Sequence, residues 1–124
     1  MNKVGWQRGA NKQRRDDSAM SALPPDLDPV VRAKAWIGDA VLALYVREKI
    51  LQLNHGAMDG ALFMELTSNK FLRLVGNATA VEAEIGMAYK RGGLDAGFAW
   101  IEGHLKEKME QRIHAYRKQM QKRR

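Results

Sequence analysis

The sequence contains no cysteine among its 124 residues. Disulfide bonds and thiolate metal sites are therefore excluded, and the absence of cysteine fits a reducing compartment without proving one. No apolar run approaches the ~20 residues that a membrane-spanning helix needs, and the N-terminus lacks the apolar core of a signal peptide. We therefore expect a soluble intracellular protein, cytoplasmic or organellar, with no membrane partner.

Period-two alternation of apolar and polar residues is also missing over any useful length, which argues against a β-sheet. A glycine-rich phosphate loop, a nucleophile elbow and a zinc motif are absent as well. The three histidines, His55, His104 and His114, show no metal-ligand spacing. The sequence therefore predicts an all-α protein and gives no support to a serine-based triad or a zinc site.

Positive charge is concentrated at the two ends of the chain. Residues 1–17 carry five basic and two acidic side chains, and residues 104–124 carry eight basic and two acidic ones. Because the net charge is +7, the middle of the chain is slightly acidic. Basic ends favour polyanions, since contacts to phosphate release counterions. The alternative is that they are solubilising tails.

Three segments follow from the composition. Residues 1–22 are polar, basic and without period, so we expect a disordered arm. Residues 23–120 carry the helical pattern and form the predicted domain, and residues 121–124 form a basic tail.

Helix signals divide the predicted domain. Asp28 is a suitable N-cap, and Pro29 suits the first helical turn. Arg91-Gly92-Gly93 closes a helix, since glycine supplies the left-handed cap, and Asp95 can cap the next one. Apolar periodicity predicts helices over about 30–53, 58–74, 78–90 and 95–120. The first is apolar on most sides, which is typical of a central helix.

Two carboxylates lie where a charge is costly to bury. Asp39 has Ala35, Trp36, Leu42 and Ala43 one turn away, and Glu82 lies in a similarly apolar turn. A carboxylate pair facing across a seam of small residues could hold Mg²⁺ or Mn²⁺ through oxygen ligands and waters.

The residues alone favour a simpler reading, in which each acid faces solvent or pairs with a basic side chain. Glu84 is also a candidate ligand, and helical periodicity does not rank it against Glu82.

Two motifs resemble the ribonuclease III family, and most closely its short mini-ribonuclease III branch. Residues 35–42 read AWIGDAVL and resemble the family signature, in which a Gly-Asp-Ala-Val core follows an apolar pair. Residues 79–86 read TAVEAEIG and resemble the second acidic motif, which is centred on Phe-Glu-Ala-Leu-Ile-Gly. Tyr89 and Gly92-Gly93-Leu94 are similar to the family's continuation of that motif, and Ser68-Asn69-Lys70 and Leu72 are similar to the helix between the two motifs. The resemblance covers roughly residues 30–105.

The resemblance implies a ribonuclease III-like helical endonuclease domain, shortened in the middle between Lys70 and Ala78. Asp39 and Glu82 match the two central acids, which implies that they are catalytic and bind Mg²⁺ (or Mn²⁺). A bound cation makes water a usable nucleophile near neutral pH and stabilises the phosphorane-like transition state. The implied activity is endonucleolytic cleavage of structured or double-stranded RNA in RNA processing, with ribosomal RNA maturation as one setting.

Family members are homodimers with the signature helix near the dyad, so we expect Ala35, Gly38 and Ala40 at a dimer interface. Larger members have acids where this chain has Ala35 and Thr79, but the mini branch resembles this chain at both positions. Glu84 stands where the family is usually apolar, so it is either an extra ligand or an exposed residue.

RNA contacts are expected from the basic ends, since a double-stranded RNA-binding domain is not seen after the matched segment. The candidates in the last helix and tail are Arg112, Arg117, Lys118, Lys122, Arg123 and Arg124. A competing hypothesis is a catalytically inactive relative that survives as an RNA-binding or ribosome-associated structural protein. A helical protein-interaction domain with no RNA role would require both motif matches to be accidental.

Overall fold

The computed structural model describes residues 23–123, and all of its regular elements are helices, which confirms the all-α prediction. The predicted arm at 1–22 and the last residue, Arg124, lie outside the described residues. The elements in chain order are η2 (Pro25–Leu27), α3 (Pro29–Leu53), α4 (Gly60–Thr67), α5 (Asn69–Leu72), α6 (Ala78–His104) and α7 (Lys106–Lys122).

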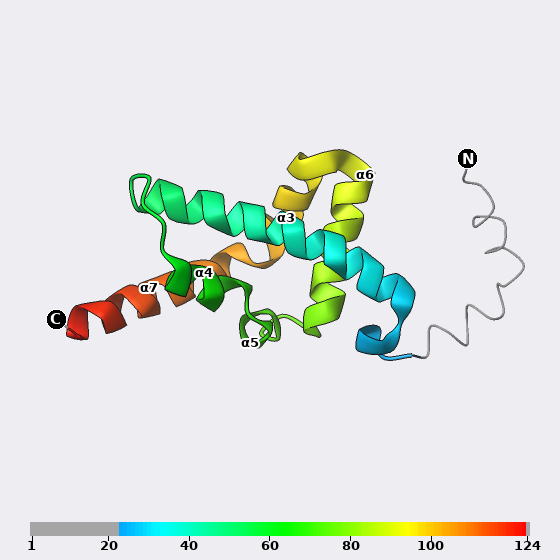
Figure 1. Cartoon of the computed structure of the whole chain (residues 1–124), viewed down its shortest axis with the longest axis horizontal. Coiled ribbons are helices and arrows are strands. Elements are labelled where there is room, and N and C mark those ends of the chain that lie inside the picture. The colour runs from blue at the N-terminus through cyan, green and yellow to red at the C-terminus, as the bar shows by residue number, and fades with distance from the viewer. Residues whose placement is uncertain (1–22, 124) are drawn as a thin grey trace, which may run out of the picture.

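Helix α3 is the long central element, and α6 crosses it (Figure 1). It begins as the sequence predicts: an Asp28 side-chain oxygen accepts a hydrogen bond from the Val30 amide at 2.9 Å, and Pro29 occupies the first turn. The prediction that this helix is a central, buried one holds only in part. One side of α3 leaves Val30, Trp36, Leu44 and Leu51 exposed.

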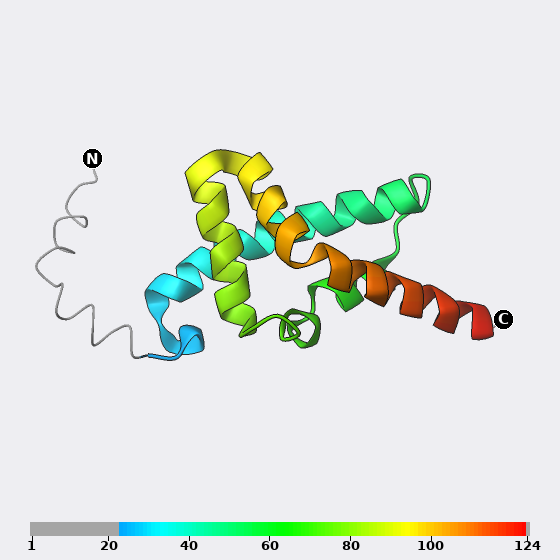
Figure 2. The same ribbon diagram turned by 180° about the vertical axis from the view of Figure 1, so that it is seen from behind.

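Helix α6 bends where the sequence places its glycines. Gly92 and Gly93 leave helical geometry, and Gly93 has a φ of 76°, which favours glycine. Two helical arms therefore meet at this bend, and the second arm turns back along the molecule (Figure 2).

The core lies where α3 meets the other helices. Its fully buried side chains come from every α-helix: Leu42, Val46, Leu62, Leu66, Phe71, Leu72, Ile85, Ile101, Leu105 and Met109. The first arm of α6 is thereby fixed against α3, which matters for the acidic residues that these two helices carry.

The structure corrects two predicted helices. The segment predicted as one helix over 58–74 is two, because Ser68 adopts an extended conformation and its hydroxyl accepts a hydrogen bond from the Phe71 amide. The helix predicted over 95–120 is broken at Leu105, whose φ is −119°. Leu105 is fully buried and continues the apolar stripe, so the periodicity carries no sign of the break.

Helix α7 extends along the long axis, away from the start of α3 (Figures 1 and 2). The Tyr116 hydroxyl donates a hydrogen bond to the Asp59 carboxylate, 3.0 Å from Oδ1 and 3.1 Å from Oδ2, and anchors the helix to the start of α4. Because α7 runs to Lys122, the first two residues of the predicted tail are helical. Among residues 23–123, the helices are too short or too polar to cross a membrane.

Candidate metal centre

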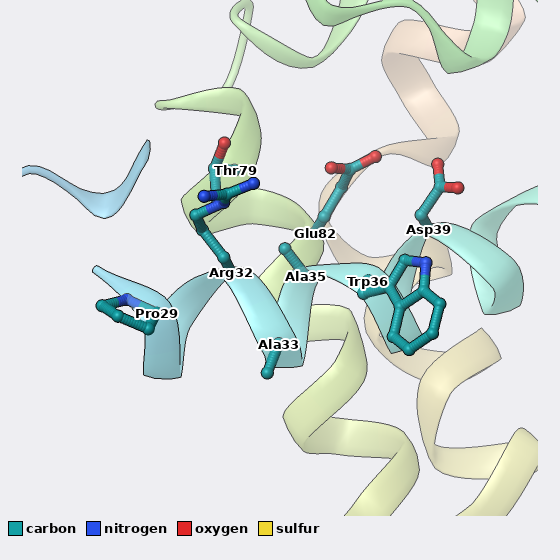
Figure 3. Close-up of a pocket in the computed structure, with 8 residues that line it drawn as sticks. All are labelled: Pro29, Arg32, Ala33, Ala35, Trp36, Asp39, Thr79 and Glu82. Atoms are coloured by element: carbon teal, nitrogen blue, oxygen red, sulfur yellow. The ribbon is translucent and has the colours of Figure 1, made fainter. Parts of the chain in front are cut away.

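A hollow of about 600 Å³ opens between the first turns of α3 and the start of α6 (Figure 3). Its lining combines two acids, one arginine, one tryptophan and small residues: Pro29, Arg32, Ala33, Ala35, Trp36, Asp39, Thr79 and Glu82. The spacing of the lining residues along each helix explains why they face one hollow, since residues three, four or seven apart share one face of a helix. Both acids that the sequence singles out therefore face the same hollow.

The two acids are brought together by a close helix crossing at Gly38. A Cβ atom added to Gly38 would lie 1.7 Å from the Glu82 carbonyl oxygen, so only glycine allows this approach. Gly86 is equally confined, because its added Cβ would lie 2.1 Å from the Lys34 carbonyl oxygen. As Gly38 precedes Asp39, this backbone contact sets the separation of the two carboxylates.

The carboxylates interact electrostatically. Glu82 is half-buried and Asp39 is exposed, and both side chains point to the same side of the helix pair (Figure 3). Burial, a hydrogen bond with Asp39 and the negative charge of Asp39 raise the pKa of Glu82 from 4.5 to about 7. Near neutral pH the Glu82 carboxyl is therefore close to the midpoint of its ionisation.

The donor set suits a hard divalent cation. Carboxylate oxygens are the ligands that Mg²⁺ prefers, and this ion commonly uses one or two of them while keeping several waters. A cation would also relieve the repulsion that raises the pKa of Glu82. Within the part of the chain that the structure describes, no group of three or more acidic or histidine side chains forms a complete ligand set. The arrangement fits a partly hydrated ion.

Glu84, the third acidic candidate, faces elsewhere. It lines a separate hollow with Trp100 and His104, whose rings stack with centroids 3.9 Å apart. Residues two apart on a helix do not share a face, which explains why Glu84 and Glu82 separate. The structure thus distinguishes two acids that periodicity left equal.

The small residues predicted at a dimer interface are placed differently. Ala35 is buried, and Gly38 packs against α6 of the same chain, so neither offers a surface to a partner. Ala40 alone of the three is exposed. Small residues mark a close approach between helices, but the sequence does not reveal whether the partner helix belongs to the same chain.

The predicted RNA-binding residues lie on α7 and differ in their surroundings. Arg112 pairs with Glu65 at 3.9 Å, and Arg117 donates a 3.4 Å hydrogen bond to Asn54. The others within the described residues, Lys118, Lys122 and Arg123, are exposed, and Arg124 lies outside them. The far end of α7 and the start of α3 occupy opposite ends of the long axis (Figure 1). These basic residues therefore do not surround the acidic pair.

Sequence reasoning missed two residues of the hollow as site candidates. Arg32 lies seven residues before Asp39, and that spacing was the available signal. Trp36 is 79% exposed, whereas an apolar residue of a central helix is expected to be buried.

Comparison of the chain with protein-family models, with curated proteins and with solved structures gives no match.

Proposed function

We propose that the protein is a ribonuclease III-type endoribonuclease that uses Mg²⁺ or Mn²⁺ to cleave structured or double-stranded RNA. The observation that carries the proposal is the shared hollow of Asp39 and Glu82, which come from two different helices and lie 43 positions apart in the sequence. Each acid also lies in a segment that resembles one of the two acidic motifs of that family.

The chain's own residues would do three things in this reaction. Asp39 and Glu82 would hold the cation, which supplies a nucleophilic water near neutral pH and neutralises charge on the reacting phosphate. The tight crossing at Gly38 would fix the spacing of the two ligands. Burial of Glu82 on one side would limit the movement of its carboxylate.

A homodimer is part of the proposal, with a different surface from the one expected. Ala33, Trp36, Ala40 and Leu44 are exposed and follow a spacing of three, four and four along α3. A symmetric contact would use this same stripe twice and cover the exposed indole of Trp36. Trp36→Ser should shift a dimer to monomer by light scattering, whereas Met64→Ser, at an exposed apolar residue of α4 outside the stripe, should not.

A second candidate is a ribonuclease III-like protein that binds RNA without cleaving it. Two observations favour it: only two acids meet in the hollow, and the connection from α5 to α6 spans only residues 73–77. The family has more sequence there, including loops that meet RNA.

RNA cleavage separates the two candidates. Purified full-length protein is incubated with a labelled RNA hairpin in Mg²⁺ or in excess chelator. The proposal predicts Mg²⁺-dependent cleavage that Asp39→Asn and Glu82→Gln abolish, since an amide keeps the shape but removes the anionic ligand. Glu84→Gln is the matched control and should cleave normally. RNA that the wild-type protein binds but leaves intact would favour the second candidate.

A further inference from the structure

Arg32 lies in the same hollow as the acidic pair, two helical turns before Asp39. Its guanidinium extends to the same side as both carboxylates (Figure 3), and Thr79 lines the same hollow. Seven residues correspond to about 10 Å along a helix axis, so Arg32 and Asp39 share a face without sharing a contact. The hollow thus has an acidic part at Asp39 and Glu82 and a basic part nearer Pro29.

The guanidinium of Arg32 has no salt-bridge partner within the described part of the chain. The salt bridges there join Lys106 to Glu102 and Arg112 to Glu65, and Arg32 makes none, although two acids line its hollow. Arg32 is also exposed, so its donors are open to solvent. A guanidinium presents a planar fork of donors that matches the oxygens of a phosphate.

We propose that Arg32 is a phosphate-binding residue, which holds an RNA phosphate neighbouring the one that lies over Asp39 and Glu82. This inference rests on the proposed function in one respect, namely that the hollow receives RNA. The separation of Arg32 from Asp39 assigns the two positions to different phosphates of the strand. The Thr79 hydroxyl lines the same hollow and offers a further donor to an RNA phosphate there.

The contact would also give the strand a direction in the hollow. Asp39 and Glu82 repel an RNA backbone unless a cation lies between them and the phosphate. Arg32 attracts the backbone with or without a cation, at the end of the hollow that is farther from Asp39. The strand should therefore run along α3 from Arg32 toward Asp39, and Arg32 should contribute to affinity even when the acidic pair is disabled.

The test measures RNA binding as a function of salt in the full-length Asp39→Asn protein, which prevents cleavage during the measurement. Adding Arg32→Gln should weaken binding of an RNA hairpin about three- to tenfold and lower the salt slope by about one unit. The matched control is Arg91→Gln, because Arg91 is an exposed arginine of α6 outside the hollow. Equal affinities and slopes for the two double variants would overturn the inference.

Neutral methylphosphonate linkages, introduced one at a time into the hairpin, locate the contact. When the neutral linkage replaces the phosphate that Arg32 binds, Arg32→Gln should no longer reduce RNA affinity, because the charge that Arg32 contacts has been removed. If Arg32→Gln reduces affinity equally with every methylphosphonate linkage, the inference is overturned.

The outcomes also separate this inference from the proposed function. An RNA that is bound through Arg32 but never cleaved by the wild-type protein contradicts the proposed function alone. Normal cleavage with no effect of Arg32→Gln on binding contradicts the role of Arg32 alone. A protein that binds no RNA contradicts both.

Discussion

Gly38 and Gly86 lie against each other where α3 crosses α6: a Cβ added to Gly38 would be 2.8 Å from the Gly86 amide nitrogen, and one added to Gly86 would be 3.1 Å from the Gly38 amide nitrogen. Backbone meets backbone at this crossing, so no side chain can move aside to admit a methyl group. The same contact determines how close Asp39 comes to Glu82.

Gly38→Ala and Gly86→Ala should each destabilise the protein by about 2–3 kcal/mol, since overpacking here forces the two helices apart. Denaturant unfolding measures the change. Gly103→Ala is the control, because no atom lies within 4 Å of its added Cβ, and removing a helical glycine should stabilise by up to ~1 kcal/mol. Similar stabilities for all three variants would mean that the helices do not cross this closely.

The raised pKa of Glu82 makes stability depend on pH in a defined direction. The carboxyl has a pKa of about 7 in the folded chain against 4.5 as a model value, so the folded state binds more protons between these two values. The ionised pair therefore destabilises the fold progressively as pH rises through this window. In chelator, Glu82→Gln should raise the melting temperature at pH 8 and change it little at pH 4.5.

Glu84→Gln is the control for that experiment, because Glu84 lies on the same helix but faces another hollow. It should shift the melting temperature equally at both pH values. A Glu82→Gln effect that does not grow with pH would show that neither burial nor Asp39 raises the pKa of Glu82.

Divalent cations should stabilise the wild-type protein at pH 8, which lies above the pKa of about 7 of Glu82. A ligand that binds only the folded state raises its melting temperature as its concentration exceeds the dissociation constant. The rise with Mg²⁺ or Mn²⁺ should be smaller at pH 5.5, because Glu82 is then protonated. It should vanish in Asp39→Asn and persist in Glu84→Gln. Equal stabilisation of all three proteins would place the cation elsewhere.

Removal of residues 118–124 should weaken RNA binding without unfolding the core. The deletion takes four basic residues from the chain, Lys118, Lys122, Arg123 and Arg124, but keeps Tyr116 and its hydrogen bonds to Asp59. Affinity for unrelated duplexes should fall alike, because duplex RNA is read mostly through shape and backbone. The salt slope should flatten by up to about four units. An unchanged slope would identify the segment as a solubilising or partner-binding tail.

The sequence was most informative where local chemistry decides the structure. Asp28 and Pro29 mark the start of α3, and Gly92 and Gly93 mark the bend of α6, because caps and glycine turns depend on neighbouring residues. The break at Leu105 was missed because Leu105 is fully buried and continues the apolar stripe, so the periodicity does not mark it.

The candidate site likewise has features that the sequence shows and features that depend on how the helices pack. The unusual apolar settings of Asp39 and Glu82 are visible in the sequence, whereas their approach depends on two helices crossing in space. Gly38, which was predicted to meet a partner chain, meets α6 instead, since spacing along one helix does not identify its neighbour. The exposure of Trp36 likewise depends on how α6 covers α3.

The central claim is hydrolysis of RNA by water at the acidic pair, and the chemistry of the product ends tests it most directly. An RNA hairpin is treated with the wild-type protein and Mg²⁺ in water enriched in heavy oxygen, and the fragments are weighed by mass spectrometry. Attack by water places one solvent oxygen in the new terminal phosphate monoester, so we predict singly labelled ends that are absent with Asp39→Asn. Fragments ending in an unlabelled 2′,3′-cyclic phosphate, which the RNA's own 2′-hydroxyl would form, or labelled ends in equal amount with Asp39→Asn, would contradict the account.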